Sequence, residues 1–251
     1  MSDTIDLNCD MGESFGAWPM GDDAAVMPWI TSANIACGFH AGDFMTMQKT
    51  VALAKKHSAV VGAHISLPDL QGFGRREMRV SPDEAYAMSL YQIGALQAVA
   101  RAQGVRVAHV KPHGALYNMA ARDRALADAV ARAVRDADEE MILVGLAGSE
   151  LIRAAEAIGA RVAHEAFADR RYEGDGSLTP RREADAVIHD VDDAVAQAVH
   201  IAKNGKVDSR AGAIVIRADT ICVHGDRENA GVFAQKLRET LEGAGIVVKA
   251  L

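Results

Sequence analysis

The chain has 251 residues, of which 49% are hydrophobic, and a formal net charge of −7 at pH 7. This length and apolar content suit one large domain, or two small ones, with an ample core. The acidic balance and the lack of a basic stripe in the sequence disfavour nucleic acid as a partner.

The cysteines and the N-terminal residues indicate the compartment. The sequence has three cysteines, an odd number, and none of them has CxxC spacing: Cys9, Cys37 and Cys222. This pattern is typical of reduced thiols rather than of a disulfide framework. The first residues carry neither a basic nor an apolar signal region, and no apolar run in the sequence approaches the ~18 residues of a membrane span. We therefore expect a cytoplasmic protein that acts without a membrane.

Short apolar runs alternate with longer helical patterns along the chain. The runs predict strands at 5–9, 32–37, 59–63, 107–110, 141–146, 161–163, 213–216 and 221–223, and the patterns predict helices at 45–57, 81–104, 122–137, 149–159, 192–205 and 229–245. This alternation is typical of a parallel sheet covered by helices. About seven strand–helix units in this length predict an α/β fold, a single (β/α) barrel over 1–251 that is seven-stranded or a distorted TIM-like barrel. An open doubly wound sheet is the alternative. In either fold, functional groups gather at the carboxyl ends of the strands.

The first predicted strand is unusually polar for a parallel sheet. Asp6, Asn8 and Asp10 alternate along it and so share one face. Parallel strands are usually apolar on both faces, and burying three unpaired polar groups is costly. The pattern indicates a functional face, although a structural role for Asp6 is equally open.

Polar side chains also follow the other predicted strands. Glycine-rich turns present His40 in "GFHAGD" and a second histidine in "HGD", since glycine lets the backbone bend and approach a ligand closely. The candidate catalytic residues are Asp10, Glu13, His40, His64, Lys111 and His113. The candidate substrate-binding residues are Asn8, Asp43, Arg75, Arg76, Arg217, Asp219 and His224.

Other polar residues favour structural roles. His109 precedes Lys111 by two positions in a predicted strand, and His164 and Glu165 have neither HExxH spacing nor glycine support. The sequence contains no GxxxxGK[ST], GxGxxG or GxSxG motif. A nucleotide would therefore need another binding device or another chain.

Seven long motifs resemble the LamB/YcsF family over residues 7–226: "DLNCDMGESFG", "TSANIACGFHAGD", "DLQGFGRREM", "HVKPHGALYN", "VGLAGSELI", "FADRRYEGDGSL" and "RADTICVHGD". The resemblance implies a barrel of the glycoside hydrolase/deacetylase type. It also implies ATP-dependent opening of the lactam 5-oxoproline to glutamate, with Mg-ATP as co-substrate and the B and C subunits of a 5-oxoprolinase as partners. Whether the chain also forms a homo-oligomer is left open.

The implied reaction suits the residues found above. Asp10 or Glu13 could act as general base and His40 or His113 as proton donor. Lys111, with Arg75 or Arg76, could bind the substrate carboxylate or a phosphoryl group.

Two alternatives stay open. A metal-dependent amide hydrolase could hold zinc with Asp10, His40 and either His64 or His113. A scaffold protein could instead bind a metabolite with the same polar residues and catalyse nothing.

Overall fold

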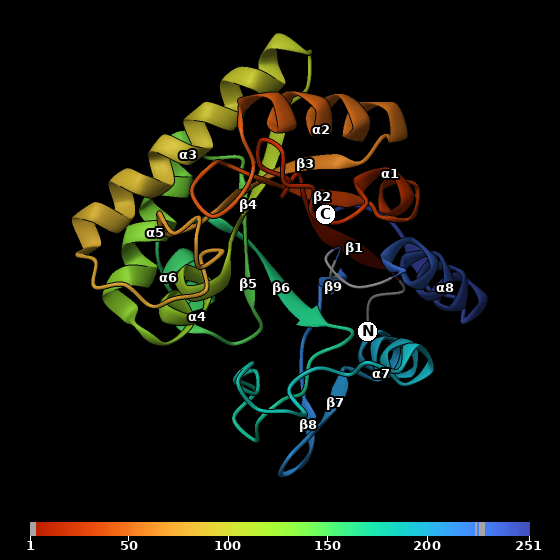
Figure 1. Cartoon of the computed structure of the whole chain (residues 1–251). Helices are drawn as coiled ribbons and strands as arrows, with labels where there is room; N and C mark the ends of the chain where they lie inside the picture. Colours follow the sequence, from red (N-terminus) through yellow and green to blue (C-terminus); the bar gives the residue numbers. More distant parts are fainter. Residues whose placement is uncertain (1–3, 224, 226–228) are drawn as a thin grey trace.

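The structure is a computed structural model that describes residues 4–223, 225 and 229–251. Seven parallel strands form a closed barrel (Figure 1) in the order β1-β2-β3-β4-β5-β6-β9, and β9 pairs back onto β1. They are β1 (Thr4–Met11), β2 (Ser32–Ala36), β3 (Val60–Ile65), β4 (Val107–Pro112), β5 (Ile142–Leu146), β6 (Arg161–Phe167) and β9 (Thr220–Val223). The short β10 (Val247–Val248) pairs with the start of β1. The predicted barrel is confirmed, and the β1–β9 pairing excludes an open sheet.

Helices cover the outside of the barrel. They are α2 (Phe44–His57), α3 (Pro82–Ala102), α4 (Gly114–Arg122), α5 (Arg124–Ala137), α6 (Glu150–Ala157), α7 (Val191–Asn204) and α8 (Ala230–Gly243), with a short α1 (Asp23–Val26) and a 3-10 turn η1 (Met27–Trp29). Side-chain caps start most of the long helices, and at α3 Ser81 and Glu84 form a capping box. No helix within 4–223, 225 and 229–251 combines the length and apolarity that a bilayer crossing requires.

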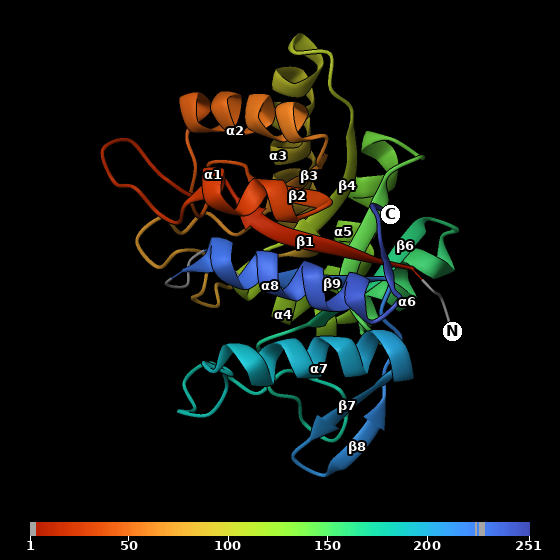
Figure 2. The ribbon, with the colours of Figure 1, turned by 90° about the vertical axis from the view of Figure 1, so that its right-hand side faces the viewer.

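Two elements differ from the sequence-based expectation. Helix α4 was not predicted, and Asp123, placed inside one predicted helix, instead ends α4 and caps α5. The strand predicted at 213–216 does not belong to the barrel. It forms β8 (Gly212–Val215), which pairs with β7 (Lys206–Ser209) in an antiparallel ribbon outside the barrel, beside α7 (Figure 2). Val215 is 82% exposed, so this apolar run serves a surface hairpin.

The barrel interior is polar, and its aliphatic core lies outside, between strands and helices. The predicted shared face of Asp6, Asn8 and Asp10 points inward. Asp6 accepts hydrogen bonds from Ser32, Thr31 and Thr220, which gives it a structural role. The polar groups around Asp6 thus satisfy one another, as burial requires.

Gly62 on β3 makes room for the ring of His109 on β4. A Cβ at Gly62 would lie 2.0 Å from His109 Nε2, and both residues are inside a closed barrel. We predict that Gly62→Ala lowers the free energy of unfolding by about 1–3 kcal/mol through this overpacking. The measurement is urea denaturation. Gly94→Ala in α3, where an added Cβ meets nothing within 4 Å, is the control and should stabilise by about 0.5–1 kcal/mol. Equal stability of the Gly62→Ala and wild-type proteins would contradict this packing.

Candidate active site

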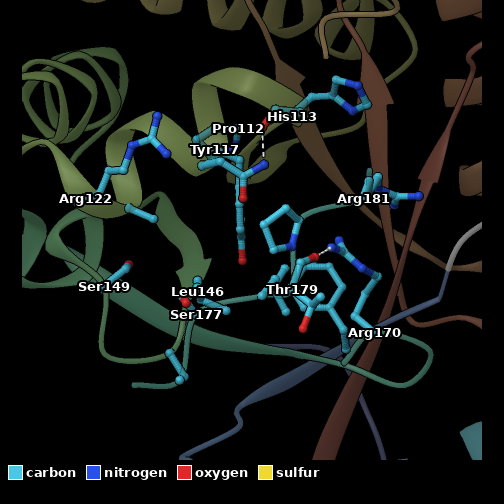
Figure 3. Close-up of a pocket in the computed structure, with 18 of the residues that line it drawn as sticks. Pro112, His113, Tyr117, Arg122, Leu146, Ser149, Arg170, Ser177, Thr179 and Arg181 are labelled. Atoms are coloured by element: carbon cyan, nitrogen blue, oxygen red, sulfur yellow. Dashed lines mark hydrogen bonds between the residues drawn. The ribbon is translucent and has the colours of Figure 1, made fainter. Parts of the chain in front are cut away.

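A cavity of about 1070 Å³ opens at the carboxyl ends of the barrel strands. Its lining includes Asp10, His64 and Lys111 from the strand ends, His113 at the start of α4, and the segment 173–183. Figure 3 shows Tyr117 of α4 and Arg170, which follows β6, facing this cavity. The cavity therefore lies at the strand ends where the candidate site residues were predicted to gather.

Lys111 is the centre of a buried charge network. Its ammonium lies 2.9 Å from Asp10 Oδ1 and 2.8 Å from Glu165 Oε1, and it donates a hydrogen bond to Asn8 Oδ1 at 3.1 Å. Burial alone would lower the pKa of Lys111, but the charges of Asp10 and Glu165 outweigh it and raise that pKa well above its ordinary value. Lys111 is therefore charged, and its charge is compensated within the barrel.

Asp10 is ionised because positively charged neighbours stabilise its carboxylate. Burial would raise the pKa of Asp10, but the charges of His64 and Lys111 hold it well below its usual range. Its Oδ2 lies 3.2 Å from His64 Nε2, and Asn34 donates to its Oδ1 at 2.9 Å. Asp10 is thus a carboxylate at neutral pH, fixed from three sides at the floor of the cavity.

A second polar layer supports this floor. Asn8 donates to Glu165 Oε1 at 3.0 Å and accepts from Asn34, whose Oδ1 in turn accepts from His109 Nε2. Burial, followed by the charge of Lys111, lowers the pKa of His109 to about 3. The structural role expected for His109 is confirmed, because it orients Asn34 beneath Asp10.

Three histidines and one glutamate form a cluster beside Asp10. His64 Nε2 lies 2.9 Å from His113 Nδ1, and the rings of His40 and His113 stack with centroids 3.9 Å apart. Glu13 Oε1 lies 3.5 Å from His40 Nε2 and 3.9 Å from His113 Nδ1. One potential ligand atom from each of these four residues falls within 4.8 Å of all the others, so the cluster could hold a metal ion.

Burial keeps two of these histidines neutral. It lowers the pKa of both His40 and His113 well below the ordinary histidine value, and the charges of neighbouring histidines add to the effect. The lowered pKa makes both rings weak bases, but in a neutral imidazole the nitrogen that carries no hydrogen offers a lone pair to a hydrogen-bond donor or a metal ion. The cluster and Asp10 together therefore provide a carboxylate and imidazole lone pairs within one small volume.

The loop that covers the cluster contains a left-handed residue. Phe73 has φ +54°, which is uncommon for a bulky side chain, and its carbonyl oxygen accepts from His113 Nε2 at 2.8 Å. Next to it, a Cβ at Gly74 would lie 2.7 Å from His40 Cβ. Such outliers cluster at functional sites, and this one fixes the orientation of His113.

The structure separates the predicted site residues into two groups. Asp10, Glu13, His64, Arg75, Lys111 and His113 line the cavity, and Asn8 and His40 pack directly beneath it. Four others lie elsewhere: Asp43 caps α2, Arg76 pairs with Asp69 and is largely exposed, and Arg217 and Asp219 pair with each other ahead of β9. His224 lies outside the described residues.

Arg217 and Asp219 are at the wrong end of the barrel. The sequence-based strand at 213–216 would have put them at a carboxyl end, but that strand is the surface ribbon. Asp219 instead precedes β9, and its carbonyl accepts from the backbone N–H of Asp6, at the amino end.

Glu165 was assigned a structural role from the sequence, yet it contacts Lys111 inside the barrel. Strand β6 runs to Phe167, four residues beyond the predicted end, and reading that longer strand would have placed Glu165 in the interior. Arg170 and Tyr117 were also not predicted to line the cavity. Tyr117 belongs to the unpredicted helix α4, and Arg170 lies in a loop that has no periodic signal.

Comparison with known proteins agrees with these features. A family model, that of the LamB/YcsF family, matches residues 5–251. The chain belongs to the LamB/YcsF family. Among curated LamB/YcsF relatives, the A subunit of 5-oxoprolinase from Bordetella pertussis is 57% identical over all of both chains. The A subunit of the Bacillus subtilis 5-oxoprolinase is 56% identical, and the match covers 98% of this chain and 96% of that one. The crystal structure of a lactam utilization protein from Thermus thermophilus superimposes with a TM-score of 0.93 at 46% identity, covering 99% of this chain and 100% of the other.

The buried position of Lys111 generates a stability prediction. Lys111→Met leaves the carboxylates of Asp10 and Glu165 together inside the barrel without a counter-charge. Breaking such a buried pair typically costs about 3–5 kcal/mol, and we expect a loss of that size in urea denaturation. Lys56→Met on the exposed face of α2 is the control and should change stability by less than about 0.5 kcal/mol. Wild-type stability of Lys111→Met would show that Lys111 is not the internal counter-ion.

His109 generates a pH prediction. Its pKa is about 3 when folded against 6.5 for an ordinary histidine, so the unfolded chain binds one more proton between these values. Stability therefore falls as the pH drops below 6.5, with a contribution of about 1.4 kcal/mol per pH unit from this residue. Urea denaturation of wild type and His109→Gln at pH 7.5, 6 and 5 measures the difference. The variant should show the shallower loss, and parallel slopes would contradict the assignment.

Proposed function

We propose that this chain is the A component of an ATP-dependent 5-oxoprolinase, which opens the lactam of 5-oxoproline to glutamate together with the B and C subunits. The names of its relatives support this role. The observation that carries the chemistry is the Asp10 carboxylate, held ionised by Lys111 and His64 at the floor of the cavity.

The geometry suits hydrolysis of a cyclic amide. Hydrolysis needs a proton acceptor for the attacking water, a donor for the ring nitrogen and stabilisation of the negative charge on oxygen. In the proposed reaction the Asp10 carboxylate takes a proton from the attacking water as general base. The same carboxyl group, once protonated, can return this proton to the leaving nitrogen.

The proposed use of ATP has its own support. Phosphorylation of the lactam oxygen would activate a resonance-stabilised amide, and the cavity volume of about 1070 Å³ slightly exceeds the range of about 300–1,000 Å³ for small-molecule sites. Arg170 is buried in its wall, and burial lowers the pKa of Arg170 only to about 10, so it stays charged. A guanidinium binds phosphate or carboxylate oxygens in pairs.

A second function is favoured by the histidine cluster. A metal-dependent amide hydrolase would use the same cavity and would need no ATP. The requirement for ATP distinguishes the two.

The experiment combines the purified chain, the B and C subunits, 5-oxoproline and Mg-ATP, and measures glutamate and ADP. We expect glutamate only in the complete mixture, with ADP formed in equal amount. Asp10→Asn should lower the rate by about 10²–10⁴-fold, because Asn keeps the shape but loses the charge. Asp123→Asn, the same change at the exposed cap of α5, is the control and should leave the rate unchanged. Glutamate formation by the isolated chain without ATP would contradict the proposal in favour of the metal-dependent hydrolase.

A further inference from the structure

Two histidines of the cluster have their protons fixed by backbone carbonyls. His64 Nδ1 lies 2.9 Å from the Lys111 carbonyl oxygen, and His113 Nε2 lies 2.8 Å from that of Phe73. A carbonyl can only accept a hydrogen bond, so each of these nitrogens carries a hydrogen. In a neutral ring the other nitrogen then presents a lone pair. His64 Nε2 and His113 Nδ1 are those other nitrogens.

These two lone pairs face each other at 2.9 Å. Two acceptors at this distance repel unless a positive species lies at the point where they converge. The species is either an extra proton, which makes one ring an imidazolium, or a metal ion. The surrounding atoms distinguish the two.

A proton on His64 Nε2 would satisfy His64, His113 Nδ1 and Asp10 Oδ2, which lies 3.2 Å from that nitrogen, but it would leave His40 without a partner. His40 is also buried, and neither of its ring nitrogens has a hydrogen-bond partner in the part of the chain that the structure describes. Its Nε2 lies 3.5 Å from Glu13 Oε1. A buried imidazole without a hydrogen bond is costly, and a metal ion next to Glu13 would provide the missing interaction for His40.

The separations suit a single ion. Zinc lies about 2.0–2.2 Å from nitrogen and carboxylate ligands, so two ligand atoms on one ion are at most about 4.4 Å apart. The four candidate atoms lie within 4.8 Å of one another and need only small shifts. In addition, a histidine ligand usually donates its second N–H to a carbonyl or carboxylate, as His64 and His113 do here.

We propose that Glu13, His40, His64 and His113 bind one divalent first-row transition metal ion at the floor of the cavity. Imidazole-rich sites of this kind suit zinc and its neighbours. Glu13, His64 and His113 line the cavity, which gives the ion a route of entry. When bound, the ion would supply positive charge that polarises an oxygen atom of water or of an amide. A catalytic role for the ion rests on the proposed function, whereas binding of the ion does not.

The test measures metal binding by the full chain in the absence of substrate and ATP. The chain is stripped with a chelator, dialysed, and titrated with zinc by calorimetry. Cobalt in place of zinc gives a visible absorption spectrum that reports the ligand geometry. We expect one ion per chain with micromolar or tighter affinity, and a cobalt spectrum typical of tetrahedral or five-coordinate nitrogen and oxygen ligation.

Single substitutions identify the ligands. His113→Gln should weaken zinc binding by at least about a hundredfold and abolish the cobalt spectrum, because a direct ligand matters more than the groups that orient it, whose loss costs about 10–100-fold. Glu13→Gln provides a smaller change with the same expected direction should His113→Gln fail to fold, as judged by circular dichroism. His164→Gln on β6, a histidine outside the cluster, is the matched control and should bind as wild type does.

Two results would overturn the inference: a wild-type chain that binds no stoichiometric zinc or cobalt, or His113→Gln and Glu13→Gln proteins that bind as tightly as His164→Gln. The outcome is independent of the proposed function. A chain that binds metal but forms no glutamate with its partners would retain this site and lose the 5-oxoprolinase role. An active complex without metal would do the reverse.

Discussion

The ammonium of Lys111, held between the carboxylates of Asp10 and Glu165, is the interaction on which the barrel interior depends. It joins β4 to β1 and β6, which are not neighbours in the sheet. A polar interior is unusual for a parallel barrel, which is normally filled with branched aliphatic side chains. Here one ammonium lies between two carboxyl groups, and the amides of Asn8 and Asn34 donate to the same carboxylate oxygens that contact Lys111.

This arrangement makes the interior and the site a single polar structure. Asn34 contacts His109 on one side and Asp10 on the other, so the deep layer determines where the carboxylate at the cavity floor points. The covering loop acts from above through the Phe73 carbonyl. Asp10 and His113 are therefore positioned from opposite directions, as a preorganised site requires.

The sequence was most informative where polar residues alternate along a predicted strand or stand at its carboxyl end. The alternation of Asp6, Asn8 and Asp10 predicted an inward face, and His64, Lys111 and His113 follow or end their strands as expected. The number of strand–helix units indicated a barrel but left an open doubly wound sheet as the alternative. The alternation along a strand is a local feature, because it is encoded over a few residues, whereas closure depends on the pairing of β9 with β1.

Prediction from the sequence was wrong where pairing between distant strands determines whether a segment belongs to the barrel and how long it is. An apolar run at 213–216 has the composition of a barrel strand, and only its partner β7 shows it to be a hairpin. That error moved Arg217 and Asp219 to the wrong end. Glu165 was missed because a strand's length depends on its neighbours. The lone pairs of His64 and His113 converge because of two backbone carbonyls, and the identities of the residues alone do not indicate those contacts.

The fit of His109 against Gly62 has an evolutionary consequence. The two positions share one volume on neighbouring strands, so they cannot vary independently. A relative with a side chain at the position of Gly62 must have a smaller residue at that of His109, and must then orient the amide of Asn34 by other means. Replacement of the polar interior by an aliphatic one must therefore begin with simultaneous changes at Gly62 and His109. Either change alone leaves a clash or a void beneath the site.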